Sequence, residues 1–132
     1  MELQVGVKAL LQNKEGKYLF VRRSSEKYPA VGAKWDIVGG RIEPGTTLME
    51  NLTREIKEEV RLDLTDEPKL VAAQDILKNG RHVVRLTYVG KIDGEPALDG
   101  DHTEYKWVTR EEMGTLNPLD SYVKTLLVNG QI

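Results

Sequence analysis

Three glutamates, Glu55, Glu58 and Glu59, lie close together in the chain, and this cluster constrains the fold more than any other feature. Their spacings of three and four residues place them on neighbouring turns of one face if the segment is helical. Carboxylates held this close repel one another, and a bound cation relieves that repulsion. Mg²⁺ prefers oxygen ligands and keeps part of its water, so it is the first candidate for that cation.

The residues around the glutamates predict a helix whose N-cap is Thr47. Thr47 and Glu50 have the spacing of a capping box, in which each side chain bonds to the backbone N–H of the other residue. Glu59 overlaps the edge of the apolar stripe and is therefore expected to be the least solvated of the three acids. The stripe consists of Leu48, Met49, Leu52, Ile56 and Val60.

The segment from Gly39 to Leu62 resembles the Nudix box, G-x5-E-x7-R-E-U-x-E-E-x-G-U, in which U is aliphatic. Thr46 stands where the pattern has its first glutamate, and Arg61 stands where it has glycine. The resemblance to the Nudix hydrolase superfamily, and to its MutT-like members, runs over most of the chain, although only the box is specific. The matching positions are Gly40, Arg54, Glu55, Ile56, Glu58, Glu59 and Leu62.

The two departures have different physical consequences. Thr46 removes one acid at the junction of loop and helix but leaves the three acids of the helix in place. Arg61 occupies a position suited to a left-handed helix end, which costs a residue other than glycine about 1 kcal/mol. Reduced or altered activity is therefore an expected consequence of the two departures.

The resemblance implies a single domain over residues 1–132, an α/β/α sandwich with a mixed sheet. The order of the elements alone gives only an α/β or α+β class. The implied activity is metal-dependent hydrolysis of the pyrophosphate linkage of a nucleoside diphosphate derivative, with nucleoside triphosphates as one candidate class. Mg²⁺, with Mn²⁺ as an alternative, neutralises the diphosphate and activates the attacking water.

The resemblance also implies roles for individual residues. Glu55 and Glu59 are the expected metal ligands, and Glu58 ligates the metal directly or through water. A carbonyl of Gly39 or Gly40, in the tight turn before the helix, completes the ligand set. Arg54, the second expected catalytic residue beside Glu58, orients the carboxylates.

Further candidates lie outside the box. Arg22 and Arg23 end a predicted strand and are candidate phosphate contacts, with an ordinary charged strand end as the equal alternative. Lys34, in the loop over residues 24–34, is a third candidate, with a solvent-facing lysine as the alternative. Glu104 is the candidate fourth metal contact or general base, with a surface salt bridge as the alternative, and His102 is a competing base.

Alternating apolar residues predict the remaining elements, and Asn79-Gly80 is a strong signal for a two-residue hairpin turn. Strands are expected over residues 3–12, 17–23, 35–38, 69–78, 81–91 and 102–108, with a short helix from 109 and a final helix over 118–128.

Charge and composition narrow the function. The net charge of −2 argues against a general nucleic-acid-binding surface. The partner that the resemblance implies is a small nucleotide or nucleoside diphosphate derivative. The chain has no cysteine, which excludes disulfides and thiolate metal sites. No signal peptide or long apolar run is evident, so a cytoplasmic protein with no membrane partner is the default expectation. A homodimer is left open.

Three classes of function remain at this point. The first is a Nudix-type pyrophosphohydrolase. The second is a Nudix-fold module that binds or senses a nucleotide without turning it over. The third is an acid-rich structural domain without a ligand. Incubation with Mg²⁺ and a nucleotide panel separates the first class from the other two.

Overall fold

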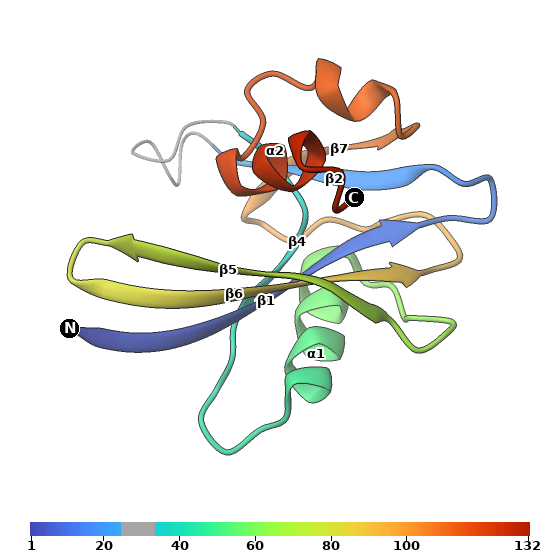
Figure 1. Cartoon of the computed structure of the whole chain (residues 1–132). Coiled ribbons are helices and arrows are strands. Elements are labelled where there is room, and N and C mark those ends of the chain that lie inside the picture. Colours follow the sequence, from blue (N-terminus) through green and yellow to red (C-terminus); the bar gives the residue numbers. More distant parts are fainter. Residues whose placement is uncertain (25–33) are drawn as a thin grey trace.

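The computed structural model describes residues 1–24 and 34–132, and these form a mixed sheet with helices on both faces (Figure 1). The layered arrangement agrees with the expected α/β sandwich. The strands are β1 (Glu2–Gln12), β2 (Tyr18–Arg23), β3 (Trp35–Asp36), β4 (Val38–Arg41), β5 (Lys69–Lys78), β6 (Arg81–Lys91) and β7 (His102–Val108). The helices are α1 (Leu48–Val60), the 3₁₀ turn η1 (Glu112–Thr115) and α2 (Ser121–Val128).

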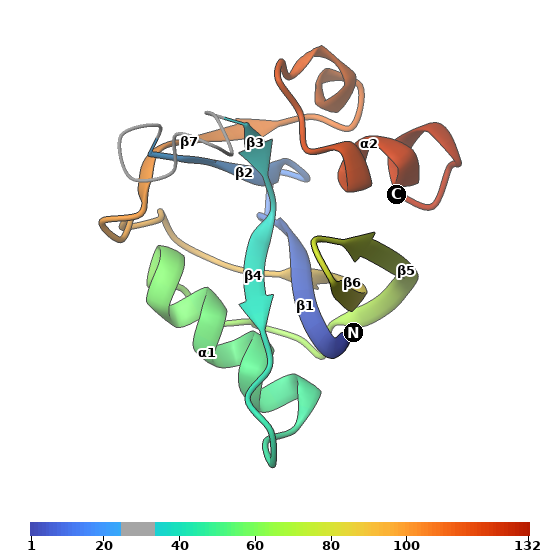
Figure 2. The same ribbon diagram turned by 90° about the vertical axis from the view of Figure 1, so that its left-hand side faces the viewer.

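The sheet is organised around β1, which has different neighbours on its two edges. On one edge β1 pairs in parallel with β6 over its whole length, and β5 lies beyond β6. On the other edge β4 pairs with the middle of β1, from Gly6 to Ala9, and β2 pairs with its end. Strand β4 therefore lies between β1 and α1 (Figure 2). Gly39 and Gly40, expected in a tight turn, instead lie within β4 and pair with β1, which brings them against the helix that carries the glutamates.

The alternation of β1 sends its side chains into two separate cores. Val7, Ala9 and Leu11 belong to the core between the sheet and α1, while Leu10 belongs to the core on the opposite face. From α1, the fully buried contributors are Leu52, Ile56 and Val60. From the other face, the contributors include Phe20, Trp35, Met113 and Val123.

The turn and the final helix follow their local sequence signals. Asn79 and Gly80 have φ angles of 53° and 72°, which is the positive-φ pair that a tight hairpin turn needs, so the predicted hairpin is confirmed. Helix α2 begins three residues later than predicted. Asp120 sets its start, because this side chain accepts hydrogen bonds from the N–H groups of Tyr122 and Val123. None of the helices in the described part of the chain could cross a lipid bilayer.

Candidate functional site

The loop before α1 is held by a buried asparagine. The predicted capping box is present, because Thr47 Oγ1 accepts from Glu50 N and the Glu50 carboxylate accepts from Thr47 N. Asn51, 1% exposed, accepts from the N–H of Glu43 and donates to the Thr47 carbonyl and the Thr46 hydroxyl. Thr46, the residue that departs from the motif, thus helps to hold the loop through its hydroxyl group.

The three glutamates of α1 lie in different environments. The side chain of Glu59 is 9% exposed, that of Glu55 is 14% exposed and that of Glu58 is 57% exposed. Glu59 is the least solvated of the three, as the apolar stripe predicted. The sequence spacing therefore brings two carboxylates to the interior edge of the helix and leaves one near its outer face.

Two glycines of β4 allow the backbone to approach these carboxylates. Gly39 has a φ of 149°, and a Cβ there would overlap the backbone carbonyl of Val7 on β1. Its N–H donates a 2.7 Å hydrogen bond to Oε2 of Glu59. A Cβ on Gly40 would lie 2.7–2.8 Å from the carboxylate atoms of Glu55. Both glycines are needed because a side chain at either position would fill the space that the backbone or a glutamate now occupies.

Burial changes the protonation of Glu59. Burial raises the pKa of Glu59 to about 8, although Lys8 and the Gly39 N–H both favour the charged form. The neighbouring carboxylates of Glu55 and Asp99 act in the same direction as burial. A buried carboxylate beside other acids is costly to ionise, and a cation bound next to it would offset that cost.

Lys8 is a site residue that the sequence reasoning did not single out. It lies on β1, and its Nζ donates to Oδ2 of Asp36 at 3.2 Å and to the carbonyl of Ile37 at 3.1 Å. Burial alone would raise the pKa of Asp36, but Lys8 and Arg85 together hold it below its usual value. The signal available in the sequence was a lysine at an interior position of an otherwise apolar strand.

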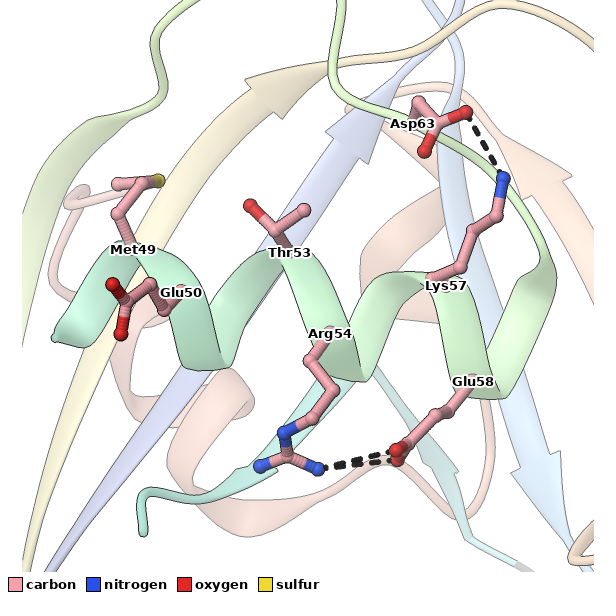
Figure 3. Close-up of a pocket in the computed structure, with 7 residues that line it drawn as sticks. All are labelled: Met49, Glu50, Thr53, Arg54, Lys57, Glu58 and Asp63. Atoms are coloured by element: carbon pink, nitrogen blue, oxygen red, sulfur yellow. Dashed lines mark hydrogen bonds and ion pairs between the residues drawn. The ribbon is translucent and has the colours of Figure 1, made fainter. Parts of the chain in front are cut away.

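Arg54 joins the acids on the accessible side of α1. Its guanidinium lies 3.1 Å from Oε1 of Glu55 and 3.2 Å from Oε2 of Glu58, and the second pair is drawn in Figure 3. Burial and the charge of Glu58 raise the pKa of Glu55, while Arg54 lowers it. Glu50, which lies one turn before Arg54, is engaged in the capping box with Thr47. Arg54 thus holds two of the three glutamates.

The donor set suits a hard divalent cation, although no ready-made cage is present. Within residues 1–24 and 34–132, no three His, Cys, Asp or Glu side chains converge closely enough to hold a metal ion. Glu55 and Glu59 lie beside Gly39 and Gly40 of β4, whereas Glu58 is directed toward Arg54. The groups near these glycines are oxygen donors, which Mg²⁺ and Mn²⁺ prefer. The residues therefore fit such an ion chemically, and Glu58 would have to leave Arg54 to join it.

The candidates on β2 and β7 lie elsewhere. Arg22 pairs with Glu104 at 2.9 Å across the two strands, and its guanidinium also lies 5.4 Å from the ring centre of Trp35. Tyr105, the next residue after Glu104, packs toward the α1 core. Strand alternation therefore directs Glu104 to the opposite face of the sheet, away from the helix. The salt bridge considered as the alternative for Glu104 is present.

The other two cation candidates lie at the end of β2 and beside β3. Arg23 is half-buried and pairs with His102 in the register of β2 and β7. Lys34 is exposed next to β3, at the edge of residues 25–33, and the loop prediction falls mostly on those residues, outside the described part of the chain. Of the three cation candidates, Arg22 is thus placed by its ion pair with Glu104, on the face of the sheet opposite the glutamates.

His102 does reach the glutamates. Its Nε2 lies 3.6 Å from Oε1 of Glu59, and its Nδ1 lies 2.7 Å from Oδ1 of Asp99. The sequence contained no local signal for Asp99, because its position follows from the packing of the 97–99 segment against the end of α1. Helix α1 ends at Val60, and its C-cap residue Arg61 has the left-handed φ of 59° and ψ of 33° that the motif alignment implied.

The chain belongs to the NUDIX domain family, whose model matches residues 2–127. Its similarity extends to solved structures, including the crystal structure of MutT protein from Methanosarcina mazei Go1. That structure has a TM-score of 0.85 and 26% identity over 97% of this chain and 92% of the other. The expected Nudix fold is therefore confirmed.

Two curated relatives have names that describe nucleotide hydrolysis. Nucleoside triphosphatase NudI of Escherichia coli (strain K12) is 29% identical over 132 residues, covering 92% of each chain. Putative 8-oxo-dGTP diphosphatase 2 of Mycobacterium tuberculosis (strain CDC 1551 / Oshkosh) is 33% identical over 86 residues. That second match covers 64% of this chain and 60% of the relative's length.

Proposed function

We propose that this protein hydrolyses the pyrophosphate linkage of a nucleoside diphosphate derivative, with nucleoside triphosphates as the leading class, in a reaction that requires Mg²⁺ or Mn²⁺. The observation that carries the proposal is the buried carboxylate of Glu59, held by the Gly39 N–H beside Glu55. Family membership and the names of the two relatives support the substrate class.

In this proposal Glu55 and Glu59 hold the divalent ion, together with a carbonyl of Gly39 or Gly40. The ion supplies charge neutralisation for the diphosphate and lowers the pKa of the attacking water. Glu58 joins the ion directly or through water after it leaves Arg54. Arg54 then keeps its contact with Glu55 and orients that carboxylate.

The proposed substrate contacts lie outside the helix. Arg22, Arg23 and Lys34 are retained as candidate contacts for phosphate oxygens. Arg22 would have to exchange its contact with Glu104 for the substrate, since the two side chains form an ion pair. The salt bridge leaves Glu104 a weaker candidate for the general base than its sequence position suggested.

The test is hydrolysis of a nucleoside triphosphate panel with Mg²⁺, followed by detection of pyrophosphate and monophosphate. The proposal expects release from at least one nucleotide by the wild-type protein and none by Glu59→Gln. Binding of a nucleotide in a thermal-shift assay without any release would instead indicate a sensor module. The absence of both release and binding across the panel would contradict the proposal.

A further inference from the structure

The pairing of β7 with β2 contains a register shift that directs the His102 side chain toward helix α1. Arg22 pairs with Glu104, but the next residue, Arg23, pairs with His102, so Thr103 is the extra residue of the bulge. An extra residue reverses the alternation beyond it, so His102 leaves the face that Glu104 occupies. His102 is buried, with a side-chain exposure of 5%, and it lies against Glu59.

The two oxygens of the Glu59 carboxylate therefore face groups from different strands, one through a hydrogen bond and the other through the longer separation of an ion pair. Oε2 accepts the 2.7 Å hydrogen bond from Gly39 N on β4. Oε1 lies 3.6 Å from Nε2 of His102 on β7. With the hydrogen bond at Oε2 and the imidazole beside Oε1, the carboxylate has fewer orientations open to it than the hydrogen bond alone would leave.

Asp99 contacts the ring nitrogen of His102 that faces away from Glu59. Its Oδ1 lies 2.7 Å from Nδ1 of His102, close enough for a strong hydrogen bond. The segment that carries Asp99 is itself fixed to α1, because Asp99 N donates to the carbonyl of Glu59 and Ala97 N donates to that of Val60. These bonds satisfy carbonyls at the end of the helix that have no partner within it. The segment that holds the histidine ring is thus hydrogen-bonded to the same helix turn that carries Glu59.

We propose that His102 is a positioning residue, held by Asp99, that fixes the Glu59 carboxylate in the orientation needed to bind the divalent cation. The inference rests on the proposed function, because it assumes that Glu59 is a ligand. His102 is poorly placed to act as the general base itself, since it is buried and each ring nitrogen faces a protein carboxylate. Residues that orient metal ligands typically change metal affinity by about 10- to 100-fold when replaced.

The test measures Mn²⁺ affinity by the loss of the free-ion electron paramagnetic resonance signal, with wild type, His102→Leu and His102→Asn. Leucine removes both ring contacts, and asparagine stays polar but is too short to span from Asp99 to Glu59. Both variants are expected to bind Mn²⁺ about tenfold or more weakly. At saturating Mn²⁺ the KM for nucleotide should stay unchanged, because both ring nitrogens of His102 face protein carboxylates.

His82 provides a matched control. It is the other histidine of the chain, and its Nε2 lies 2.6 Å from Oδ1 of Asp75 on the β5–β6 hairpin. His82→Asn therefore removes a similar His–Asp pair away from the glutamates and should leave Mn²⁺ affinity unchanged. Thermal melting of each variant identifies those that fold. If His102→Leu does not fold, the Mn²⁺ affinity of His102→Asn is the test.

The outcomes separate this inference from the proposed function. A folded His102 variant with wild-type Mn²⁺ affinity would overturn the positioning role, provided that Glu59→Gln abolishes Mn²⁺ binding. If Glu59→Gln also binds Mn²⁺ like the wild type, the metal assignment fails and the positioning role fails with it. Weaker binding in both His102 variants, with His82→Asn unchanged, supports the inference.

Discussion

The backbone N–H of Gly39 donates a 2.7 Å hydrogen bond to Oε2 of Glu59, which connects strand β4 with the last turn of helix α1. This bond fixes the distance between the strand that offers carbonyl groups and the helix that offers carboxylates. It also depends on glycine, because a Cβ at position 39 would overlap strand β1. The relation between strand and helix is therefore set before any ligand binds.

The neighbouring glycine tests whether space beside Glu55 matters. Gly40→Ala would place a methyl group 2.7–2.8 Å from the Glu55 carboxylate, so the carboxylate must move away from β4. We expect Mn²⁺ affinity and turnover to fall about tenfold or more, with a smaller effect on stability. Titration with Mn²⁺ measures the change. Gly114→Ala is the control, since the nearest atom there would be 4.0 Å away, and equal losses in both variants would refute the explanation.

The raised pKa of Glu59 predicts a particular pH dependence for the metal-free protein. The folded protein holds a proton on Glu59 up to about pH 8, whereas the unfolded chain loses it near the ordinary value of 4.5. The contribution of Glu59 to stability is thus fully present below pH 4.5 and is lost as pH rises through 8. Glu59→Gln should flatten this decline between pH 5 and 8 in chemical denaturation with chelator present, and an unchanged slope would argue against it.

The left-handed end of α1 offers a stabilising substitution. Arg61 has a φ of 59°, a conformation that glycine adopts without steric cost. Arg61→Gly should therefore raise the free energy of unfolding by about 1 kcal/mol. Arg61→Ala removes the same side chain but keeps the Cβ, so it should give no such gain. Denaturant titration compares the two, and equal stabilities would show that the backbone conformation is not strained.

Thr46 is expected to support the loop through its hydroxyl group. That hydroxyl donates to the Glu43 carbonyl at 2.6 Å and accepts from the side-chain amide of Asn51. Thr46→Val keeps the shape but removes both bonds, so it should lower the free energy of unfolding by about 1 kcal/mol. Thr46→Ser retains the hydroxyl and should stay near the wild type. A valine variant as stable as the serine variant would contradict this role.

The helix could be predicted from sequence because its signals are local. The capping box at Thr47, the apolar stripe and the burial of Glu59 all follow from residues within a few turns of one another. The contacts of Lys8 and His102 could not be predicted in the same way. They depend on the pairing of β1 with β4 and on the register shift in β7, which join segments far apart in the chain.

Glu104 is a residue whose role was predicted from its type and position, without knowledge of the strand register. Its position near the end of the chain matched an acidic residue expected beside the helix, and its residue type was suitable for a base. Strand alternation nevertheless directs its side chain to the opposite face, where it meets Arg22. A sequence pattern without strand register cannot distinguish these two faces.

The most direct test of the whole account is the rate of pyrophosphate release from a nucleoside triphosphate panel with Mg²⁺, for wild type and Glu59→Gln side by side. Glutamine preserves the size of the side chain but cannot carry its charge. The account predicts Mg²⁺-dependent release by the wild type that falls to background in the variant while the variant stays folded. Equal release by the two proteins, or release by the wild type that persists in excess chelator, would contradict it.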